Sequence, residues 1–125
     1  MKKTIMAKDA PAAVGPYVHA VQAGNLLYAS GQLGLVPETG ELPEGIEAQT
    51  KQSLDNVGAV LRAAGYDYKD VIKTTVFIDN MDDFGTVNEI YATYFTGETP
   101  ARSCVEVAKL PKGALVEVEV VAYKE

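Results

Sequence analysis

The residues best suited to chemistry lie in two alternating segments near the C-terminus, residues 100–107 (PARSCVEV) and 115–121 (LVEVEVV). Side chains that alternate between apolar and polar indicate extended strands rather than helices. Pro111 and Gly113 mark a turn between the two segments, so the sequence predicts that they form a hairpin or near-hairpin.

Sorting these side chains by face separates an apolar set from a polar one. We expect the valines, from Val105 to Val120, to cover a core. An arginine can hold a planar carboxylate through two hydrogen bonds, and a carboxylate can carry a proton or orient a water molecule. The predicted polar face carries both kinds of group: Arg102, Cys104, Glu106, Glu117 and Glu119.

A purely structural interpretation of Arg102 stays open, because an arginine among carboxylates also suits an ion pair. Its candidate partners are Glu117, Glu119 and Glu106. If Glu117 instead lies in a partly desolvated cleft, burial should raise its pKa and a nearby Arg102 should oppose that rise. We expect Glu106 and Glu119 to be solvated or interface charges.

Cys104 is the only cysteine and His19 the only histidine. A nucleophilic thiol needs a base beside it, and nothing in the sequence places His19 near Cys104. We therefore expect Cys104 to be a buried, inert thiol that lines the site, and His19 to be a surface or interface residue. One histidine and one cysteine cannot build a zinc site.

The composition indicates a single soluble, globular domain over residues 1–125, with 47% hydrophobic residues and a formal charge of −6. Acidity without a basic cluster argues against a nucleic-acid backbone as partner. No apolar stretch reaches the roughly 20 residues of a membrane span, and no secretory signal is evident. A lone cysteine suits a reducing compartment, so cytoplasm is expected.

The expected elements follow the order β-β-β-α-β-α-β-β, an α+β fold with both helices on one face of the sheet. Gly24 and Asn25 favour a hairpin turn, and Gly31 should mark a bulge or a close backbone approach. The earlier strands are predicted at residues 4–6, 18–23, 26–33 and 71–79, and the helices at 46–64 and from 82 or 83 to 95. Tyr91, Tyr94 and Phe95 are expected in the core.

Two helices can cover only one face of such a sheet, and nothing in the chain is left to cover the other. Either set of side chains from residues 71–79 would put apolar groups on that uncovered face. An uncovered, partly apolar face predicts self-association. Polar groups such as Arg102 and Glu117 would then line clefts between subunits.

Several motifs, in order and with near-constant spacing from about residue 3 to residue 123, resemble the Rid family, also called the YjgF family, and most closely its RidA branch. The most specific is Pro100-Ala101-Arg102-Ser103-Cys104-Val105-Glu106-Val107. The others are Ala13-Val14-Gly15-Pro16-Tyr17, Ser30-Gly31-Gln32 with Pro37-Glu38-Thr39-Gly40, residues 52–57 (QSLDNV), residues 71–77 (VIKTTVF) and Val87-Asn88.

The resemblance implies a chorismate-mutase-like α+β fold, assembled as a homotrimer with the sheets packed inside and active sites at subunit interfaces. It implies hydrolysis of 2-imino and enamine acids, such as 2-aminoacrylate, 2-iminopropanoate and 2-iminobutanoate, to 2-oxo acids and ammonia. Pyridoxal-phosphate-dependent dehydratases produce these substrates. The resemblance implies no cofactor and no metal.

By the same resemblance, Arg102 matches the arginine that holds the substrate carboxylate, and the backbone amide of Cys104 helps to bind it. Glu117 matches the glutamate that positions and activates water. Residues 96–99 form a shorter loop than many members have, which bears on pocket shape. Four further positions match pocket-lining residues, some of them contributed by a neighbouring subunit: Tyr17, Ser30, Gly31 and Asn88.

A second hypothesis is a regulatory trimer that uses Arg102 to hold a 2-oxo acid or amino acid without turning it over. Because this chain keeps both Arg102 and Glu117, the deaminase is favoured. Ribonuclease activity, which is also associated with this family, fits poorly with a charge of −6 and no basic stripe.

Overall fold

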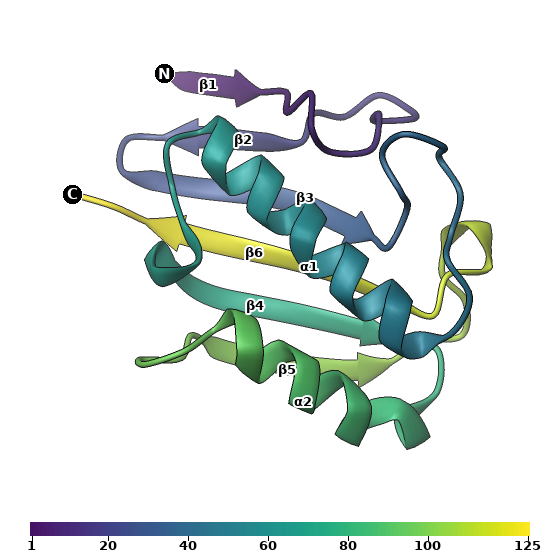
Figure 1. Cartoon of the computed structure of the whole chain (residues 1–125). Helices are drawn as coiled ribbons and strands as arrows, with labels where there is room; N and C mark the ends of the chain where they lie inside the picture. The colour runs from purple at the N-terminus through teal and green to yellow at the C-terminus, as the bar shows by residue number, and fades with distance from the viewer.

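A computed structural model describes all 125 residues and has six strands and two helices (Figure 1). The predicted element order is confirmed. Short 3-10 turns lie at Tyr68–Asp70, Met81–Asp83 and Pro111–Gly113. The main elements are β1 (Lys2–Ile5), β2 (Ala20–Ala23), β3 (Leu26–Leu33), α1 (Ile46–Ala63), β4 (Val71–Ile78), α2 (Phe84–Tyr94), β5 (Ala101–Glu106) and β6 (Val116–Tyr123).

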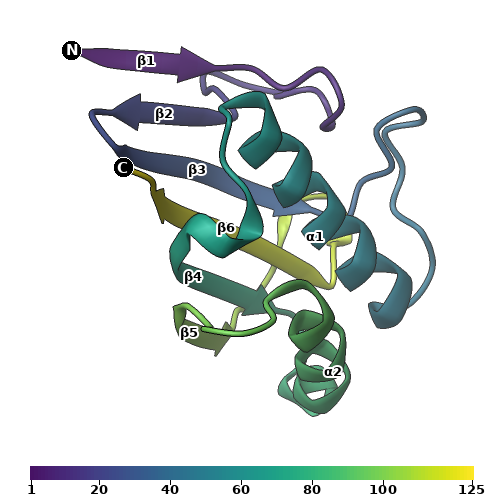
Figure 2. The same ribbon diagram turned by 60° about the vertical axis from the view of Figure 1, so that its left-hand side comes forward.

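The strands form one mixed sheet in the order β1-β2-β3-β6-β4-β5. Only β4 and β5 pair in parallel; the other neighbours are antiparallel. Both helices pack on the same face, as predicted (Figures 1 and 2). The core lies between this face and the helices, where Leu54 and Leu61 of α1 and Val116 of β6 are fully buried. Neither helix is long and apolar enough to cross a membrane.

The predicted hairpin between the last two strands is wrong. β6 inserts between β3 and β4, whereas β5 pairs with β4 alone at the far edge. Burial explains the arrangement, because Val116, Val118, Val120 and Ala122 are at most 2% exposed and need neighbours on both sides. The turn residues near Pro111 therefore belong to a connection that carries the chain across β4.

The hairpin predicted at Gly24 and Asn25 is confirmed, since Ala23 pairs with Leu26 and Gly24 has a φ of 60°. The irregularity predicted at Gly31 is confirmed as well. The β3–β6 register shifts between Ala29 and Gln32, which is the signature of a β-bulge.

Polar side chains of α1 fix the chain just beyond this bulge. The Ser53 hydroxyl donates to the Gln32 carbonyl at 2.7 Å, and the Asn56 amide donates to the carbonyls of Leu33 and Leu35 at 3.0 and 2.8 Å. Ser53 and Asn56 are buried, so these bonds satisfy groups that water cannot reach. The segment after β3 is thereby anchored to the helix layer.

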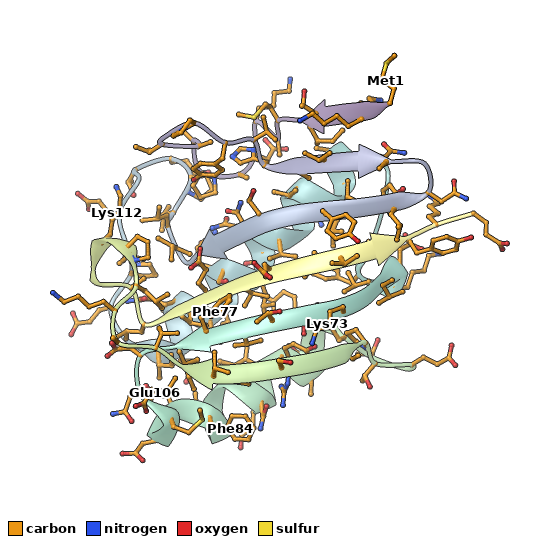
Figure 3. All side chains as sticks on the ribbon, turned by 180° about the vertical axis from the view of Figure 1, so that it is seen from behind. Met1, Lys73, Phe77, Phe84, Glu106 and Lys112 are labelled. Carbon is orange, nitrogen blue, oxygen red and sulfur yellow. The ribbon has the colours of Figure 1, made fainter.

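The other face of the sheet is left open by the chain. Lys73 and Phe77 project from β4 on this side (Figure 3). Tyr28, Val105 and Tyr123 are 56%, 42% and 44% exposed. The sequence expectation of an uncovered, partly apolar face is therefore met.

His19 is not the surface or interface residue that we expected. It is 2% exposed and bridges two backbone groups: the Ala7 N–H donates to its Nδ1 at 2.9 Å, and its Nε2 lies 2.8 Å from the Pro11 carbonyl oxygen. A carbonyl can only accept, so Nε2 donates to Pro11, while Nδ1 accepts from Ala7. His19 thus fastens residues 7–11 to the start of β2.

We predict that His19→Ala lowers the free energy of unfolding by about 2 kcal/mol or more, because it leaves two buried backbone groups without partners. Urea denaturation at fixed protein concentration measures the change. Lys8→Ala, in the same segment but exposed, is the matched control. Equal stability of the two variants would show that the His19 bridge contributes nothing.

Candidate active site

The predicted site residues divide into two clusters that lie on opposite faces of the sheet. Tyr17, Ser30, Gly31 and Glu117 surround a cavity on the open face. Arg102, Cys104 and Asn88 lie on the helix-covered face, at the β5 edge. Arg102, Cys104 and Glu117 were expected on one polar face, and no pattern in the sequence predicted that they lie on opposite faces.

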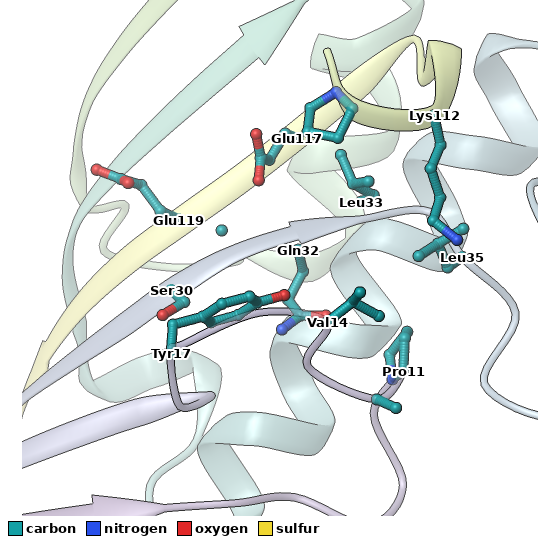
Figure 4. Close-up of a pocket in the computed structure, with 13 residues that line it drawn as sticks. Pro11, Val14, Tyr17, Ser30, Gln32, Leu33, Leu35, Lys112, Glu117 and Glu119 are labelled. Atoms are coloured by element: carbon teal, nitrogen blue, oxygen red, sulfur yellow. The ribbon is translucent and has the colours of Figure 1, made fainter. Parts of the chain in front are cut away.

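The cavity has a volume of about 560 Å³ and lies between β3, β6 and the irregular segment before β2 (Figure 4). Tyr17 and Glu117 lie on opposite sides of it. Its lining is mixed, with two carboxylates and one cation: Pro11, Ala12, Val14, Tyr17, Ser30, Gly31, Gln32, Leu33, Leu35, Pro111, Lys112, Glu117 and Glu119.

The Glu117 side chain lies directly against the backbone of Gly31. A Cβ on residue 31 would stand 2.5 Å from Glu117 Oε2 and 2.8 Å from its Cδ, closer than real contacts allow. Glycine is therefore required for the carboxylate to lie where it does. The close approach predicted from the sequence thus has a partner, Glu117.

Burial raises the pKa of the Glu117 carboxyl above its ordinary value of 4.5, and the neighbouring charge of Glu119 raises it further. The direction agrees with the expectation from the sequence. The opposing effect expected from Arg102 is absent, because Arg102 points to the other face of the sheet. A carboxyl that holds its proton more tightly is better suited to exchange protons near neutral pH.

The wall of the cavity across from Glu117 is an exposed segment that contains Val14 and Tyr17. Tyr17 is 47% and Val14 75% exposed. The Ser30 hydroxyl donates to the Val18 carbonyl at 2.8 Å, so Ser30 ties this wall to β3. The wall depends on that bond and on the His19 bridge.

The predicted face of Arg102 is wrong. In the parallel β4–β5 pair, Arg102 lies beside Thr74 and Cys104 beside Val76, and both β4 partners are fully buried under the helices. Our expectation assumed that a sheet has a single apolar face. This sheet has two, so Val105 could lie on the open one.

Arg102 makes no ion pair, since the chain's only salt bridge joins Lys51 to Glu47. Its Nη1 donates to Asn88 Oδ1 at 2.7 Å. Its Cζ lies 4.8 Å from the ring centroid of Tyr91 and 5.5 Å from that of Phe84. The structural interpretation, in which Arg102 pairs with a carboxylate, is thus excluded within one chain. Most of its five N–H donors remain free for an anion.

The expectation of an inert thiol fits the surroundings of Cys104. The side chain is partly buried against the core, and no histidine contacts it, because both His19 ring nitrogens bond backbone groups. Burial raises the pKa of the thiol above 9.0, and the smaller effect of Arg102 lowers it. A neutral thiol is a poor nucleophile.

Sequence reasoning missed Phe84 and Tyr91 as neighbours of Arg102 and assigned Tyr91 to the core alone. The signal in the sequence was spacing: Phe84, Asn88 and Tyr91 follow one another at intervals of four and three residues, which puts all three on one side of α2.

Sequence reasoning also missed Lys112, which lines the cavity and is the only non-glycine residue with a positive φ, 60°. No group of three or more metal-ligating side chains converges anywhere in the chain.

Together the two clusters contain what carboxylate recognition and proton transfer require. Arg102 offers a charged fork of donors, and Glu117 offers a carboxylate with a raised pKa. They cannot contact the same small molecule within one chain, because the sheet stands between them.

Comparison with known proteins places the chain among close relatives. The family described as Endoribonuclease L-PSP matches residues 7–124. The 2-iminobutanoate/2-iminopropanoate deaminase of Escherichia coli strain K12 is 50% identical over 127 residues, covering 99% of both chains. The enzyme of that name from Mus musculus is 52% identical over 125 residues, covering 99% of this chain and 93% of the relative.

Solved structures agree closely with the fold. Escherichia coli TdcF with bound serine has a TM-score of 0.95 at 44% identity, covering 98% of this chain and 99% of that one. RidA from the Antarctic bacterium Psychrobacter has a TM-score of 0.95 at 46% identity, with the same coverage. The mixed sheet with two helices on one face is therefore the architecture of these relatives.

We predict that iodoacetamide alkylates Cys104 more slowly in the native protein than in urea at pH 8, because only the thiolate reacts and burial raises the pKa of the folded thiol. Since the folded pKa is raised above 9.0, the native rate should still climb above about pH 10, where that of the unfolded thiol levels off. Mass spectrometry follows the single cysteine without ambiguity. Fast native alkylation that levels off below pH 8 would restore a nucleophilic role.

Proposed function

The chain belongs to the Endoribonuclease L-PSP family, and from that membership and the geometry of its two clusters we propose that it hydrolyses reactive 2-imino and enamine acids to 2-oxo acids and ammonia. Relatives about 50% identical over their full length carry the name 2-iminobutanoate/2-iminopropanoate deaminase. The chain is accordingly an enzyme that deaminates imines.

The observation that carries the proposal is the unpaired guanidinium of Arg102. A 2-imino acid presents a planar carboxylate next to its C=N bond, and a guanidinium can donate to both carboxylate oxygens without ever losing its proton. Asn88, Tyr91 and Phe84 hold Arg102 without neutralising it. We assign Arg102 to the substrate carboxylate, helped by the backbone amide of Cys104.

Glu117 is assigned to the proton transfers. An enamine first takes a proton on its terminal carbon and becomes an iminium; water then adds to the iminium carbon and gives up a proton, and collapse of the adduct releases ammonia and the 2-oxo acid. A carboxyl with a raised pKa can deliver and accept these protons and orient the water. Tyr17, Ser30 and Gly31 line the cavity around it.

We propose that the site is completed between subunits of a homotrimer. Arg102 and Glu117 lie on opposite faces of one sheet, so a shared substrate needs them from two copies. The open face carries Phe77, Val105 and Tyr123, which suit burial against another copy. Packing these faces together would bring the cavity of one chain toward the β5 edge of the next.

One alternative is a regulatory trimer that binds an amino acid or 2-oxo acid without turnover. The structure of Escherichia coli TdcF with bound serine favours it, because that relative holds an amino acid. The ribonuclease reading suggested by the family's name has less support, since a charge of −6 repels phosphates. We further propose that the enzyme works in the cytoplasm, where a lone cysteine stays reduced.

We predict that Arg102→Ala reduces deamination to the uncatalysed rate and that Glu117→Gln slows it about 100-fold or more while the fold persists. A pyridoxal-phosphate-dependent threonine dehydratase generates 2-iminobutanoate, and semicarbazide traps it. Catalytic amounts of the wild-type protein should suppress trapping.

Arg102→Lys is the matched control, since it keeps the charge and loses the fork, and it should retain intermediate activity. An unchanged rate in Glu117→Gln would remove Glu117 from the mechanism. If wild type leaves trapping unaltered while 2-oxobutanoate still binds, the regulatory trimer is the correct function.

A further inference from the structure

The surroundings of Arg102 contain one contact to which neither the family resemblance nor the mechanism assigns a role: the hydrogen bond between Tyr91 and Thr74. The Tyr91 hydroxyl and Thr74 Oγ1 lie 2.8 Å apart. Tyr91 is 7% and Thr74 0% exposed, so neither side chain is available to touch substrate freely. Any role in the reaction must therefore act through a third residue.

That third residue is Arg102, which both side chains adjoin. Thr74 is its direct neighbour in the parallel pairing of β4 and β5. Tyr91 places its ring 4.8 Å from the guanidinium carbon. The strand pairing, the hydroxyl contact and the ring contact therefore form a closed loop of Arg102, Thr74 and Tyr91.

The loop is supported from behind as well. Phe95 packs on Tyr91 with a ring-centroid distance of 4.6 Å, which restricts rotation of the tyrosine ring. The ring of Phe84 also faces the guanidinium, with its centroid 5.5 Å from Arg102 Cζ. Asn88 then fixes one edge of the fork through its 2.7 Å hydrogen bond. Two rings and one amide thus hold the guanidinium of Arg102 in place.

Every group in this enclosure is uncharged. Burial raises the pKa of Tyr91, so the phenol remains neutral beside the cation. A carboxylate partner would also orient an arginine, but it would occupy the donors and cancel the charge that the substrate needs. Aromatic faces attract the cation while leaving its edge N–H donors free.

We propose that Tyr91, locked by Thr74, is a positioning residue that sets the plane of Arg102 for binding the substrate carboxylate. The proposal rests on the proposed function, in which Arg102 binds that carboxylate. It extends the site to two residues that lie beneath the guanidinium and make no substrate contact of their own.

The test compares Tyr91→Leu, which removes the ring, with Tyr91→Phe and Thr74→Val, which remove only the hydroxyl contact. Tyr91→Leu should weaken 2-oxobutanoate binding, measured by calorimetry, about tenfold, and raise KM for 2-iminobutanoate more than it lowers kcat. Tyr91→Phe and Thr74→Val should show smaller losses, about threefold each, because the ring remains. Partial rescue by Phe identifies the ring as the positioning element.

Tyr94→Leu is the matched control. Tyr94 lies on α2 as well, but its hydroxyl bonds Asp55 and its ring packs on Tyr68, away from Arg102. It should lower the melting temperature and leave 2-oxobutanoate affinity unchanged. If Tyr91→Leu behaves like Tyr94→Leu, Tyr91 is merely structural and the proposal is overturned.

Failure of this proposal is distinguishable from failure of the proposed function. If the wild type deaminates, Arg102→Ala is inactive and Tyr91→Leu has an unchanged KM, only the positioning role is overturned. Wild type that binds 2-oxobutanoate without turnover overturns the deaminase, and the affinities still test Tyr91. Should Tyr91→Leu not fold, the double variant Tyr91→Phe/Thr74→Val decides: unchanged affinity there overturns the proposal.

Discussion

The pairing of β5 with β4 is the constraint on which the rest of the site depends. Because Arg102 lies in register with the buried Thr74, its side chain must point toward the helix layer. Glu117 of β6 pairs with Phe77 and must point to the open face. A one-residue shift in either register would exchange these faces. The pairing therefore keeps Arg102 and Glu117 of one chain apart, and makes the open face an essential part of the proposed enzyme.

The two clusters also differ in how each keeps its charge usable. Arg102 is surrounded by neutral groups, an amide and two rings, so that its charge remains for a ligand. Glu117 lies against the Gly31 backbone, and burial, followed by the neighbouring charge of Glu119, raises its pKa. The surroundings of Arg102 leave its positive charge unpaired, and the surroundings of Glu117 raise the pKa of its carboxyl. Within one chain the sheet separates the two groups, so Arg102 does not lower the pKa of Glu117.

Much of the fold followed from the sequence, and the errors have physical causes. Periodicity located both helices to within about two residues, and Gly31 was correctly predicted as a bulge and close approach. The predicted hairpin between the last two strands was wrong because the prediction considered only that they are neighbours in the sequence. The buried valines of β6 need a place at the centre of the sheet, with a strand on each side. The prediction for the face of Arg102 was wrong because Val105, although apolar, lies on the open face of the sheet and is 42% exposed. The prediction for His19 was wrong because its ring binds two backbone groups, which no side-chain pattern in the sequence indicates.

The most direct test of the central claim, that two copies share each site, is complementation between inactive variants. Arg102→Ala and Glu117→Gln chains are unfolded, mixed in equal amounts and refolded together. Random trimers should recover about a quarter of wild-type activity, because three quarters of them are mixed and each mixed trimer has one intact site in three. Activity no higher than that of the variants refolded separately would contradict the account and place both residues in one chain's site.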